Sequence, residues 1–441
     1  MGKRLGIRRE DKSELERRAP LTPDDVAALI QEHGITVSIQ PSDSRIFPDQ
    51  AYSDAGATVI EDLTDCDLIV GIKEVPGERL IEGKPHLFFS HTHKGQSYNM
   101  PLLEEMLKKQ VTLLDYELVT DDSGRRLIAF SYQAGQAGMI NSLWSLGQRL
   151  SVKGIDTPLS ALKQAIRYEG GLDEAKAAIH EVGNTLREQG LPNSVSPLII
   201  GITGEGRVAD GARDVLAVMN PIELTSSQLL DDDLISSLSD REIYVVPFHM
   251  EHFLERADGG NSFDFSEYVE HPERYRSVFS RFLPHLTVMV NGIYWDERYP
   301  KLVTLADVKS LFESGEPKLT VIGDVTCDVD GSVETTVKAA LPDNPVFVYD
   351  PASGTIRDGF EGDGLLMMTV DILPSEIPET SSVHFGEMLR PMIPELLAID
   401  FSRNFDQLEL PAAFRQAVIS HQGKLTPNFD HLHEYLPGSN D

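Results

Sequence analysis

Cysteine is almost absent from this sequence. Only Cys66 and Cys327 occur among 441 residues, which is too few for a disulfide framework or a cysteine-based zinc site. A chain of this length buries enough apolar surface to fold without such cross-links. At about 150 residues per domain, the length predicts two or three domains. The default location of a chain so poor in cysteine is the cytoplasm.

Long apolar runs and positive charge are also scarce. No stretch approaches the roughly 20 apolar residues that a membrane-spanning helix needs, and residues 1–12 lack the apolar core of a secretory signal. Lys and Arg number 39 against 70 Asp and Glu, a formal net charge of −31. Nucleic acids and anionic membranes are therefore disfavoured as partners, because both bind basic surfaces. An acidic surface favours solubility, and a salt-adapted host is an open explanation for it.

Short apolar runs alternate with helical stretches in the first third of the chain, which predicts an α/β domain with a mostly parallel sheet. Thr22 as the cap and Pro23 at the first position predict a helix that runs to Gly34. Strands are expected at residues 3–8, 36–39, 68–72, 87–90 and 111–114. The tail after residue 405 is expected to be helix and loop.

A second α/β domain is expected over residues 136–379, approximately, with a long helix at 134–153 and a polar helical insert at 157–190. Its strands are expected at 197–203, 221–225, 243–247, 286–291, 320–325 and 346–349. A helical segment at 376–400 would return the chain to the first domain, which would then comprise residues 1–135 and about 380–441. The predicted architecture is two Rossmann-like domains with an interdomain cleft.

Residues 204–209, GEGRVA, match the pattern G-x-G-x-x-[G/A] between a predicted strand and a predicted helix. That context is typical of a dinucleotide-binding loop. Gly204 would allow a tight turn, and Gly206 would let the backbone approach a pyrophosphate at the helix N-terminus. Ala209 and Gly211 would let the helix pack closely on the strand. A plain glycine turn is the alternative.

The end of the second strand usually contacts the 2′ position of the cofactor's adenosine ribose. Here the strand tip offers Thr225 and Ser226, and Glu223 lies within the strand. The missing carboxylate favours NADPH over NADH. Arg207 could pair with a 2′-phosphate or face solvent.

Polar residues follow or adjoin predicted strands of the first domain, at the edge where α/β sheets bind ligands. The segments are 16–23, 71–76, 89–94 and 115–117. Taken singly, Arg18 could be a surface cation, Lys73 an edge-strand charge and His91 a core histidine. His91 and His93 could face one way on a strand, but no third ligand is evident, so no metal site is expected.

These segments resemble the lysine–ketoglutarate reductase half of bifunctional aminoadipic semialdehyde synthase. They are also similar to lysine-forming saccharopine dehydrogenase and, more distantly, to alanine dehydrogenase and transhydrogenase. The resemblance covers nearly the whole chain. Its motifs are LGIRRED at 5–11, ERRAPLTP at 16–23, GIKEVP at 71–76, FFSHTHK at 88–94, LLDYE at 113–117, GRRLIAF at 124–130, AGMIN at 137–141, HPERY at 271–275, NGIYW at 291–295 and GDVTCDVDGSVE at 323–334.

The resemblance implies that the ε-amine of lysine condenses with 2-oxoglutarate and that NADPH reduces the imine to saccharopine. Four residues match the catalytic acid–base pair and its acidic neighbours: Lys73, His91, Glu74 and Glu117. Three cations match positions that bind substrate: Arg18, Lys94 and Arg126. Guanidinium groups suit this task because they bind carboxylates in two-pronged fashion.

The resemblance also implies that the cofactor is bound by Gly204, Gly206, Gly211, Asn291, Gly292, Tyr294 and Asp324. Further candidates for cofactor binding, from the glycine loop and the strand tip, are Arg207, Val208, Thr225 and Ser226. A helix cap is the alternative role for Asp324. His93 and Arg207 depart from the pattern of the family, so His93 has no implied role and the cofactor preference stays open. The chain ends at Asp441 without the saccharopine-oxidising half, so a separate enzyme would take saccharopine onward. A monomer and a homodimer are both open.

Three alternative functions remain at this point. The first is the NAD-linked enzyme that runs the same chemistry toward lysine. The second is a related reductase that takes a different amine. The third is a catalytically silent nucleotide-binding regulator, which would have no need of the full acid–base set.

Overall fold

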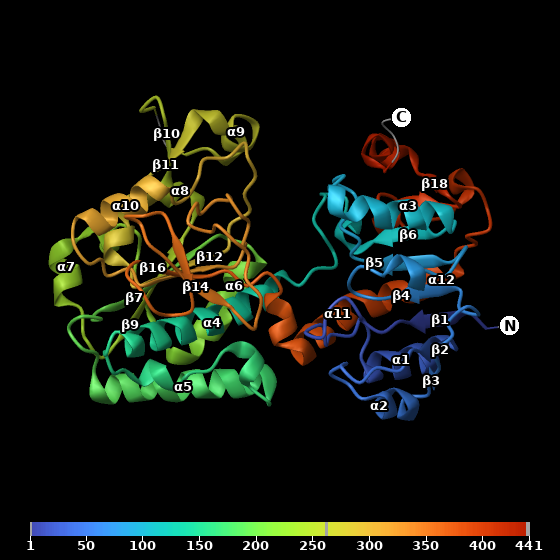
Figure 1. Ribbon diagram of the computed structural model, residues 1–441, viewed down its shortest axis with the longest axis horizontal. Coiled ribbons are helices and arrows are strands. Elements are labelled where there is room, and N and C mark those ends of the chain that lie inside the picture. The colour runs from blue at the N-terminus through green and yellow to red at the C-terminus, as the bar shows by residue number, and fades with distance from the viewer. Residues whose placement is uncertain (1, 261–262, 438–441) are drawn as a thin grey trace. The chain divides into compact units, whose positions relative to one another are not determined.

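The computed structural model describes residues 2–260 and 263–437 of the chain. The chain divides into two compact units, shown in Figure 1. Unit 1 comprises Met1–Phe130 and Pro378–Asp441, and unit 2 comprises Ser131–Ile377. Within the described residues, no helix combines the length and apolar character needed to cross a lipid bilayer.

Unit 1 is built on an eight-stranded sheet in the order β18-β17-β6-β5-β4-β1-β2-β3. Its strands are β1 (Arg4–Ile7), β2 (Thr36–Ile39), β3 (Thr58–Val59), β4 (Leu68–Val70), β5 (Pro85–Phe88), β6 (Thr112–Asp115), β17 (Val418–His421) and β18 (Lys424–Leu425). Its α-helices are α1 (Pro23–His33), α2 (Asp49–Asp54), α3 (Met100–Lys108), α11 (Pro378–Leu389) and α12 (Ile393–Ala398). The pairs from β3 through β6 are parallel.

Helix α1 begins and ends as the sequence predicts. The Thr22 hydroxyl accepts a hydrogen bond from the Asp25 backbone N–H at 3.1 Å, and the Asp25 carboxylate accepts one from the Thr22 N–H at 2.9 Å. This reciprocal pair satisfies two backbone donors that the first helical turn leaves free. Gly34 ends the helix with φ 62°, a conformation that costs glycine little.

The expectation of helix and loop after residue 405 is wrong. Strand β17 pairs antiparallel with β6, and β18 pairs antiparallel with β17. Gln422 and Gly423 connect the two strands, both with positive φ, as a two-residue hairpin turn requires. The strand is hard to recognise in the sequence because its apolar part is only Val418 and Ile419.

Unit 2 contains a second eight-stranded sheet, in the order β15-β14-β16-β13-β12-β7-β9-β8. Its strands are β7 (Leu198–Thr203), β8 (Ile222–Glu223), β9 (Ile243–Phe248), β12 (Val288–Asn291), β13 (Val321–Asp324), β14 (Val346–Tyr349), β15 (Ile356–Asp358) and β16 (Leu365–Met368). A separate hairpin joins β10 (Leu254–Arg256) and β11 (Tyr275–Ser277). The α-helices are α4 (Ser131–Val152), α5 (Gly171–Gln189), α6 (Arg207–Leu216), α7 (Asp232–Ser237), α8 (Met250–Phe253), α9 (Phe265–Glu270) and α10 (Leu305–Glu313).

Apolar side chains cover both faces of the sheet in unit 2. Ile200 and Ile202 of β7 pack in one buried cluster, with residues of α4, α5 and α6. Ile199 of the same strand packs in another cluster, on the opposite face. Such two-sided burial explains why β7 is a continuous apolar run, as is typical of parallel sheets.

The predicted helical insert at 157–190 is only partly α-helical. Residues 158–161 and 165–167 form short 3-10 turns, and helix α5 begins only at Gly171. Pro158 cannot donate a helical hydrogen bond, and Gly170 and Gly171 favour a turn over a continuous helix. Helix α5 itself buries one apolar face in the core of unit 2.

Candidate active site

The polar segments predicted from the sequence follow neighbouring strands of unit 1. Strands β1, β4, β5 and β6 lie consecutively in the parallel part of the sheet, so their carboxyl ends share one edge. Glu10 follows β1, Lys73 follows β4, His91 follows β5 and Glu117 follows β6. The alternative role of Lys73 as an edge-strand charge is wrong, because β4 lies between β1 and β5.

Glu10 holds the loop that carries Lys73. Its carboxylate accepts hydrogen bonds from the backbone N–H groups of Ile72 at 2.7 Å and Lys73 at 2.9 Å. Burial raises the pKa of Glu10, although the charge of Arg8 opposes the shift. Sequence reasoning missed this role of Glu10, whose only signal is a carboxylate shortly after a predicted strand.

Arg18 is buried against a carboxylate and an aromatic ring. Its Nε donates to Oε1 of Glu16 at 2.7 Å, and its Nη2 donates to Oε2. The guanidinium carbon lies 4.2 Å from the centre of the Phe130 ring. Arg18 is therefore not the surface cation that one interpretation allowed. Its Nη1 makes no hydrogen bond within residues 2–260 and 263–437, so that nitrogen can receive a ligand carboxylate.

Lys73 has the environment of a lysine that loses its proton easily. Burial, followed by the nearby charge of Arg18, lowers the pKa of Lys73, while Glu16 and Glu74 oppose the shift. In the described part of the chain, its ammonium forms neither an ion pair nor a hydrogen bond with a side chain. A lysine with a lowered pKa can act as a general base.

Glu74 fixes the orientation of His91. Its Oε1 accepts hydrogen bonds from Nδ1 of His91 at 2.8 Å and from Nζ of Lys12 at 2.6 Å. Burial alone would raise the pKa of Glu74, but these two hydrogen bonds outweigh it and lower the pKa to about 2. The ionised carboxylate can only accept, so Nδ1 of His91 donates. Nε2 of His91 therefore remains for proton transfer.

His91 and His93 do not share the face of a strand, contrary to one expectation. Both lie in the loop after β5, and His91 has φ 51°. The side-chain amide of Asn99 donates to the carbonyl of His91 at 3.1 Å and so supports this unusual backbone conformation. His93 points to a different carboxylate, since its Nδ1 lies 3.5 Å from Oε2 of Glu117.

The Glu117 carboxylate lies close to two further cations, Arg126 and Lys94. Nη2 of Arg126 donates to its Oε1 at 2.5 Å, and Nζ of Lys94 lies 3.9 Å from the same atom. Burial alone would raise the pKa of Glu117, but Arg126 and then His93 outweigh it and lower the pKa. Arg126 and Lys94 are both half-exposed or more, so they can reach a bound carboxylate.

The buried Asp115 carboxylate links the loops after β5 and β6 through hydrogen bonds. It accepts hydrogen bonds from the hydroxyl and the backbone N–H of Ser90, the latter at 2.9 Å, and from the Glu117 N–H at 2.8 Å. Burial raises the pKa of Asp115. This residue places the neighbours of His91 and Glu117, a role that sequence reasoning missed.

The glycine loop of unit 2 has the shape that a dinucleotide needs. A Cβ on Gly204, which has φ 105°, would lie 2.8 Å from the carbonyl oxygen of Gly292. A Cβ on Gly206 would meet no atom within 4 Å, so the space above this exposed residue is open. Gly206 immediately precedes helix α6, whose N-terminal N–H groups attract phosphate. These residues fit a nicotinamide dinucleotide.

Gly211 has a packing role that differs from the prediction. A Cβ there would lie 2.0 Å from the carbonyl oxygen of Tyr132, and one on Gly135 would lie 1.9 Å from that of Val208. Gly211 therefore lets α6 pack on helix α4, where the sequence predicted close packing of helix on strand. Val208 also contacts the loop after β12, since a Cβ on Gly292 would lie 2.7 Å from its Cγ1.

Asn291 and Asp324 form a buried network at the carboxyl ends of β12 and β13. Nδ2 of Asn291 donates to Oδ1 of Asp324 at 2.9 Å, and Oδ1 of Asn291 accepts from the Thr203 hydroxyl at 2.9 Å. Burial raises the pKa of Asp324. Asp324 ends a strand that no helix follows directly, so its alternative role as a helix cap is wrong. Tyr294, three residues beyond Asn291, is 75% exposed.

Thr225 and Ser226 do not lie beside the glycine-loop strand. Strand β8 is at the edge of the sheet and pairs only with β9 in the described residues, whereas β9 pairs with β7. The Thr225 hydroxyl accepts a hydrogen bond from the Gln228 N–H at 3.1 Å. It therefore supports a local turn, and a cofactor contact at this strand tip stays a prediction.

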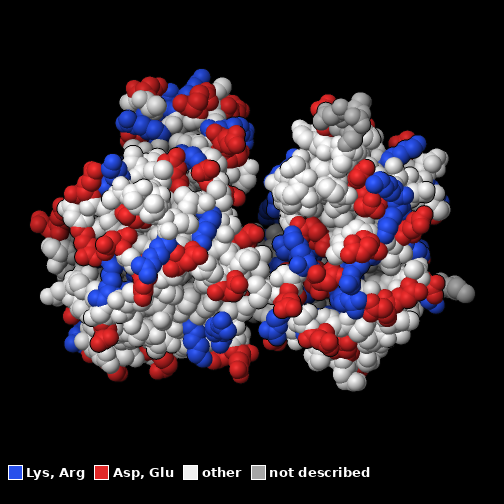
Figure 2. Space-filling model, in the orientation of Figure 1, with Lys and Arg blue, Asp and Glu red and all other residues white. Residues whose placement is uncertain are grey.

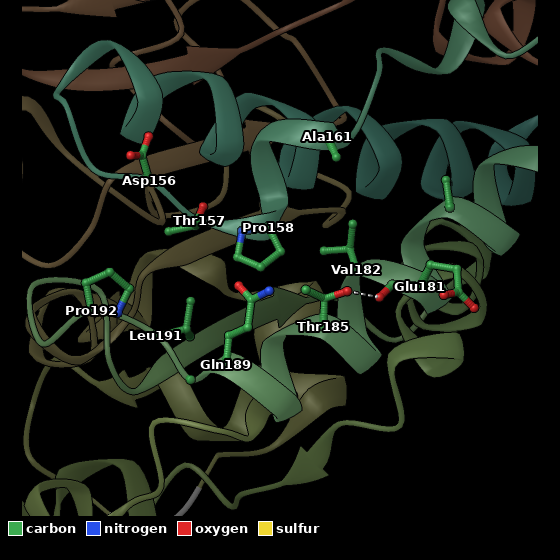
Figure 3. Close-up of a pocket in the computed structure, with 12 residues that line it drawn as sticks. Asp156, Thr157, Pro158, Ala161, Glu181, Val182, Thr185, Gln189, Leu191 and Pro192 are labelled. Carbon is green, nitrogen blue, oxygen red and sulfur yellow. Dashed lines mark hydrogen bonds between the residues drawn. The ribbon is translucent and has the colours of Figure 1, made fainter.

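Figure 3 shows a further cavity in unit 2, of about 900 Å³. It is lined by residues 156–158, by one side of α5 that includes the buried Val182, and by residues 190–192. Residues 190–192 precede β7, whereas the glycine loop follows β7, so the cavity lies toward the other edge of the sheet. None of the predicted site residues lines it.

The charge pattern of the surface is mixed. On the face shown in Figure 2, Asp and Glu are scattered over both units, with Lys and Arg interspersed among them. Across the described ranges, no group of three or more His, Cys, Asp or Glu side chains is arranged to hold a metal ion.

Comparison with known sequences places related proteins over almost the whole chain. Residues 6–137 match the family described as alanine dehydrogenase/PNT, N-terminal domain. Alpha-aminoadipic semialdehyde synthase from Arabidopsis thaliana is 38% identical over 98% of this chain and 41% of its own length. The mitochondrial protein of the same name from Rattus norvegicus is 36% identical over 97% of this chain and 47% of its own length. The chain thus spans less than half of these relatives.

Another relative matches over nearly all of its length. Saccharopine dehydrogenase (NAD(+), L-lysine-forming) from Emericella nidulans is 28% identical over 92% of this chain and 95% of its own. Among solved structures, an L-alanine dehydrogenase covers 98% of both chains with a TM-score of 0.61 and 16% identity. The transhydrogenase from Sinorhizobium meliloti covers 96% of this chain with a TM-score of 0.52 and 14% identity. These two structures share the fold.

Proposed function

Because the chain is a homologue of alpha-aminoadipic semialdehyde synthase and of lysine-forming saccharopine dehydrogenase, we propose that it is a nicotinamide-dependent oxidoreductase of lysine metabolism. The proposed reaction condenses the ε-amine of L-lysine with 2-oxoglutarate and reduces the imine to saccharopine. In this proposal, unit 1 binds the substrates and unit 2 binds the cofactor. Lysine, 2-oxoglutarate and saccharopine are its small-molecule partners, and the cytoplasm is its compartment.

The proposal depends mainly on Lys73 and His91, which lie on the loops after the neighbouring strands β4 and β5. Imine formation needs one group to remove a proton from the lysine ammonium and another to protonate the hydroxyl that leaves the carbinolamine. Lys73 supplies a base, because burial and Arg18 lower its pKa. His91 supplies an acid, because Glu74 holds its Nδ1 and leaves Nε2 to move the proton.

The cations of unit 1 suit the acidic substrates. The substrate 2-oxoglutarate is a dianion, and saccharopine carries three carboxylates. Nη1 of Arg18 and the exposed groups of Lys94 and Arg126 offer charge-assisted hydrogen bonds to them. Glu16 and Glu117 partly neutralise these cations before the substrate arrives, which limits the cost of placing several positive charges together.

A bound nicotinamide supplies the hydride that reduces the imine. The residues of unit 2 bind and orient it: the glycine turn at Gly204 and Gly206 leaves room for the pyrophosphate, and α6 offers free N–H groups to it. The buried pair of Asn291 and Asp324 keeps the loops after β12 and β13 in place. The choice between NADPH and NADH depends on the residues that contact the adenosine ribose.

An absorbance assay tests the proposal directly. The purified chain is mixed with 2-oxoglutarate and NADPH, then with lysine, with ornithine or with no amine, and the series is repeated with NADH. Oxidation that requires both lysine and 2-oxoglutarate, with saccharopine identified by mass, is the expected result. The variants Lys73→Met and His91→Ala serve as negative controls.

The other outcomes identify the rival functions. If ornithine or another amine replaces lysine, the chemistry stands and the proposed substrate is wrong. Saccharopine-dependent reduction of NAD⁺, with little reduction of NADP⁺, would favour the NAD-linked enzyme that runs the same chemistry toward lysine. If no amine supports oxidation although a nicotinamide cofactor binds, the chain is a nucleotide-binding regulator.

A further inference from the structure

The strand that neighbours β7 in the sheet is β9. These two strands pair in parallel along their whole length, from Leu198 opposite Ile243 to Thr203 opposite Phe248. The intervening strand in sequence, β8, pairs with the outer side of β9. In doubly wound dinucleotide sites, the residue at the end of the strand next to the glycine loop contacts the adenosine ribose. In this sheet that position follows Phe248.

The tip of β8 is displaced from this position in two directions. Adjacent strands are about 4.8 Å apart, so β8 lies about two such spacings from β7. Strand β8 also ends at Glu223, level with Val245, whereas β9 continues to Phe248. Thr225 and Ser226 are therefore set back from the edge where the cofactor binds.

The end of β9 instead lies directly against the glycine loop. The Gly204 N–H donates to the carbonyl of Phe248 at 3.2 Å. The next residue, His249, places its Nδ1 2.5 Å from Oε1 of Glu205, the residue between the two loop glycines. Both side chains remain nearly half exposed. Because a carboxylate only accepts, Nδ1 donates, and Oε2 of Glu205 makes no hydrogen bond in the described part of the chain.

The neighbouring histidines and arginines form no hydrogen bond to Oε2 of Glu205 in the described part of the chain. The His249 N–H donates to Nδ1 of His252 at 3.1 Å, and Arg281 donates to the carbonyl of His252 at 2.9 Å. Arg207, at the start of α6, is exposed and forms no ion pair among the described residues. The Glu205 carboxylate, paired with His249, thus stands in the glycine loop with one oxygen free to accept a hydrogen bond.

We propose that Glu205, held in place by His249, is the residue that determines cofactor specificity. Its free oxygen accepts a hydrogen bond from the 2′-hydroxyl of an unphosphorylated ribose, and its charge repels a 2′-phosphate. NADH is therefore preferred over NADPH, in contrast to the expectation from Thr225 and Ser226. The inference rests on the proposed use of a nicotinamide cofactor and adds its class.

Equilibrium binding of the cofactors tests this assignment without the chemical step. Isothermal titration of the full chain, with no amine or keto acid present, gives the Kd of NADH and of NADPH. Glu205→Gln keeps the size of the side chain and removes its charge. The ratio of the NADPH Kd to the NADH Kd is expected to fall by about tenfold or more in this variant, as for the loss of one like-charge contact. His249→Asn, which releases Glu205, should change the ratio in the same direction by less.

The double variant Thr225→Val, Ser226→Ala is the matched control and should leave the ratio unchanged. Circular dichroism and the unfolding temperature establish that each variant is folded. An unchanged ratio in Glu205→Gln overturns the inference, as does a changed ratio in the control. A wild-type preference for NADPH that Arg207→Ala abolishes would also overturn it. If the wild type binds neither cofactor, the proposed function fails together with the inference, whereas binding with an unaltered ratio refutes the inference alone.

Discussion

Oε1 of Glu74 lies 2.8 Å from Nδ1 of His91, and this contact leaves Nε2 as the imidazole nitrogen that is not bound to the carboxylate. The two residues come from loops after adjacent strands, β4 and β5. His91 adopts its positive φ within this arrangement. In the proposed reaction, Glu74 is therefore a positioning residue that orients His91.

Replacing His91 should abolish most turnover while leaving the cofactor site intact. His91→Ala is expected to lower kcat by about 10²–10⁴-fold, the usual contribution of a positioned general acid. Glu74→Gln should lower kcat by less and alter its pH profile, because the imidazole loses its charged partner. His93→Gln is the matched control and should have a far smaller effect. An equal loss of cofactor binding in His91→Ala, measured by titration, would assign this residue a structural role instead.

Lys73→Met should lower kcat and raise the unfolding temperature at pH 7. Loss of the base is expected to reduce kcat by about 10²–10⁴-fold. Because the folded-state pKa of Lys73 is lowered, the unfolded chain binds the proton more tightly and burial of the cation costs stability at neutral pH. The variant should therefore unfold at a higher temperature than the wild type at pH 7, and this advantage should shrink as the pH rises toward the ordinary lysine value. A variant that is less stable at pH 7 contradicts this explanation.

Glu376 should make unit 2 less stable as the pH rises. Burial raises the pKa of this carboxyl to about 7, although hydrogen bonds from Asn141 and Gln164 oppose the shift. A raised folded-state pKa stabilises the protein below the ordinary value near 4.5, and this contribution is lost as the pH passes 7. The shift corresponds to about 3 kcal/mol. Denaturant unfolding from pH 5 to 8 should show the loss, and Glu376→Gln should flatten the profile.

Two glycine substitutions should separate binding from folding. Gly206→Ala places a methyl group in open space above the loop, so it should leave stability unchanged and weaken cofactor binding where the pyrophosphate approaches. Gly211→Ala places a methyl group 2.0 Å from the Tyr132 carbonyl, so it should destabilise unit 2 by about 1–3 kcal/mol or more. Thermal unfolding and cofactor titration measure the two effects. Equal destabilisation in both variants would contradict this division.

The sequence predicts the regular elements well where local signals agree. The cap at Thr22 and the apolar run before Gly204 identify α1 and β7, because capping and two-sided burial leave clear local patterns. The same patterns cannot show which strands become neighbours in space. The positions of β8 and β9 in the sheet could therefore not be read from the sequence, and a ribose contact at Thr225 and Ser226 stays a prediction.

In the candidate site, too, some residues can be predicted from the sequence and others cannot. The sequence motifs predict Lys73 and His91 as site residues, and the structure shows their surroundings. Glu10 and Asp115 act through hydrogen bonds to backbone groups of other loops. Nothing in a single sequence marks such contacts, because the acceptor and donor are far apart along the chain. Tertiary contacts also turned Gly211 from a position expected to pack against a strand into a helix–helix contact.

The last strands of unit 1 have a consequence for how the chain is made. Strand β6, which leads into Glu117, is covered on its outer side by β17, a segment near residue 420. A ribosome releases residues in order, and domains generally fold as units during synthesis. Unit 2 is one continuous segment, so all of its residues emerge before unit 1 can be completed. The nascent chain thus holds β6 as an open edge until the final hairpin arrives, and unit 1, although begun first, is finished last.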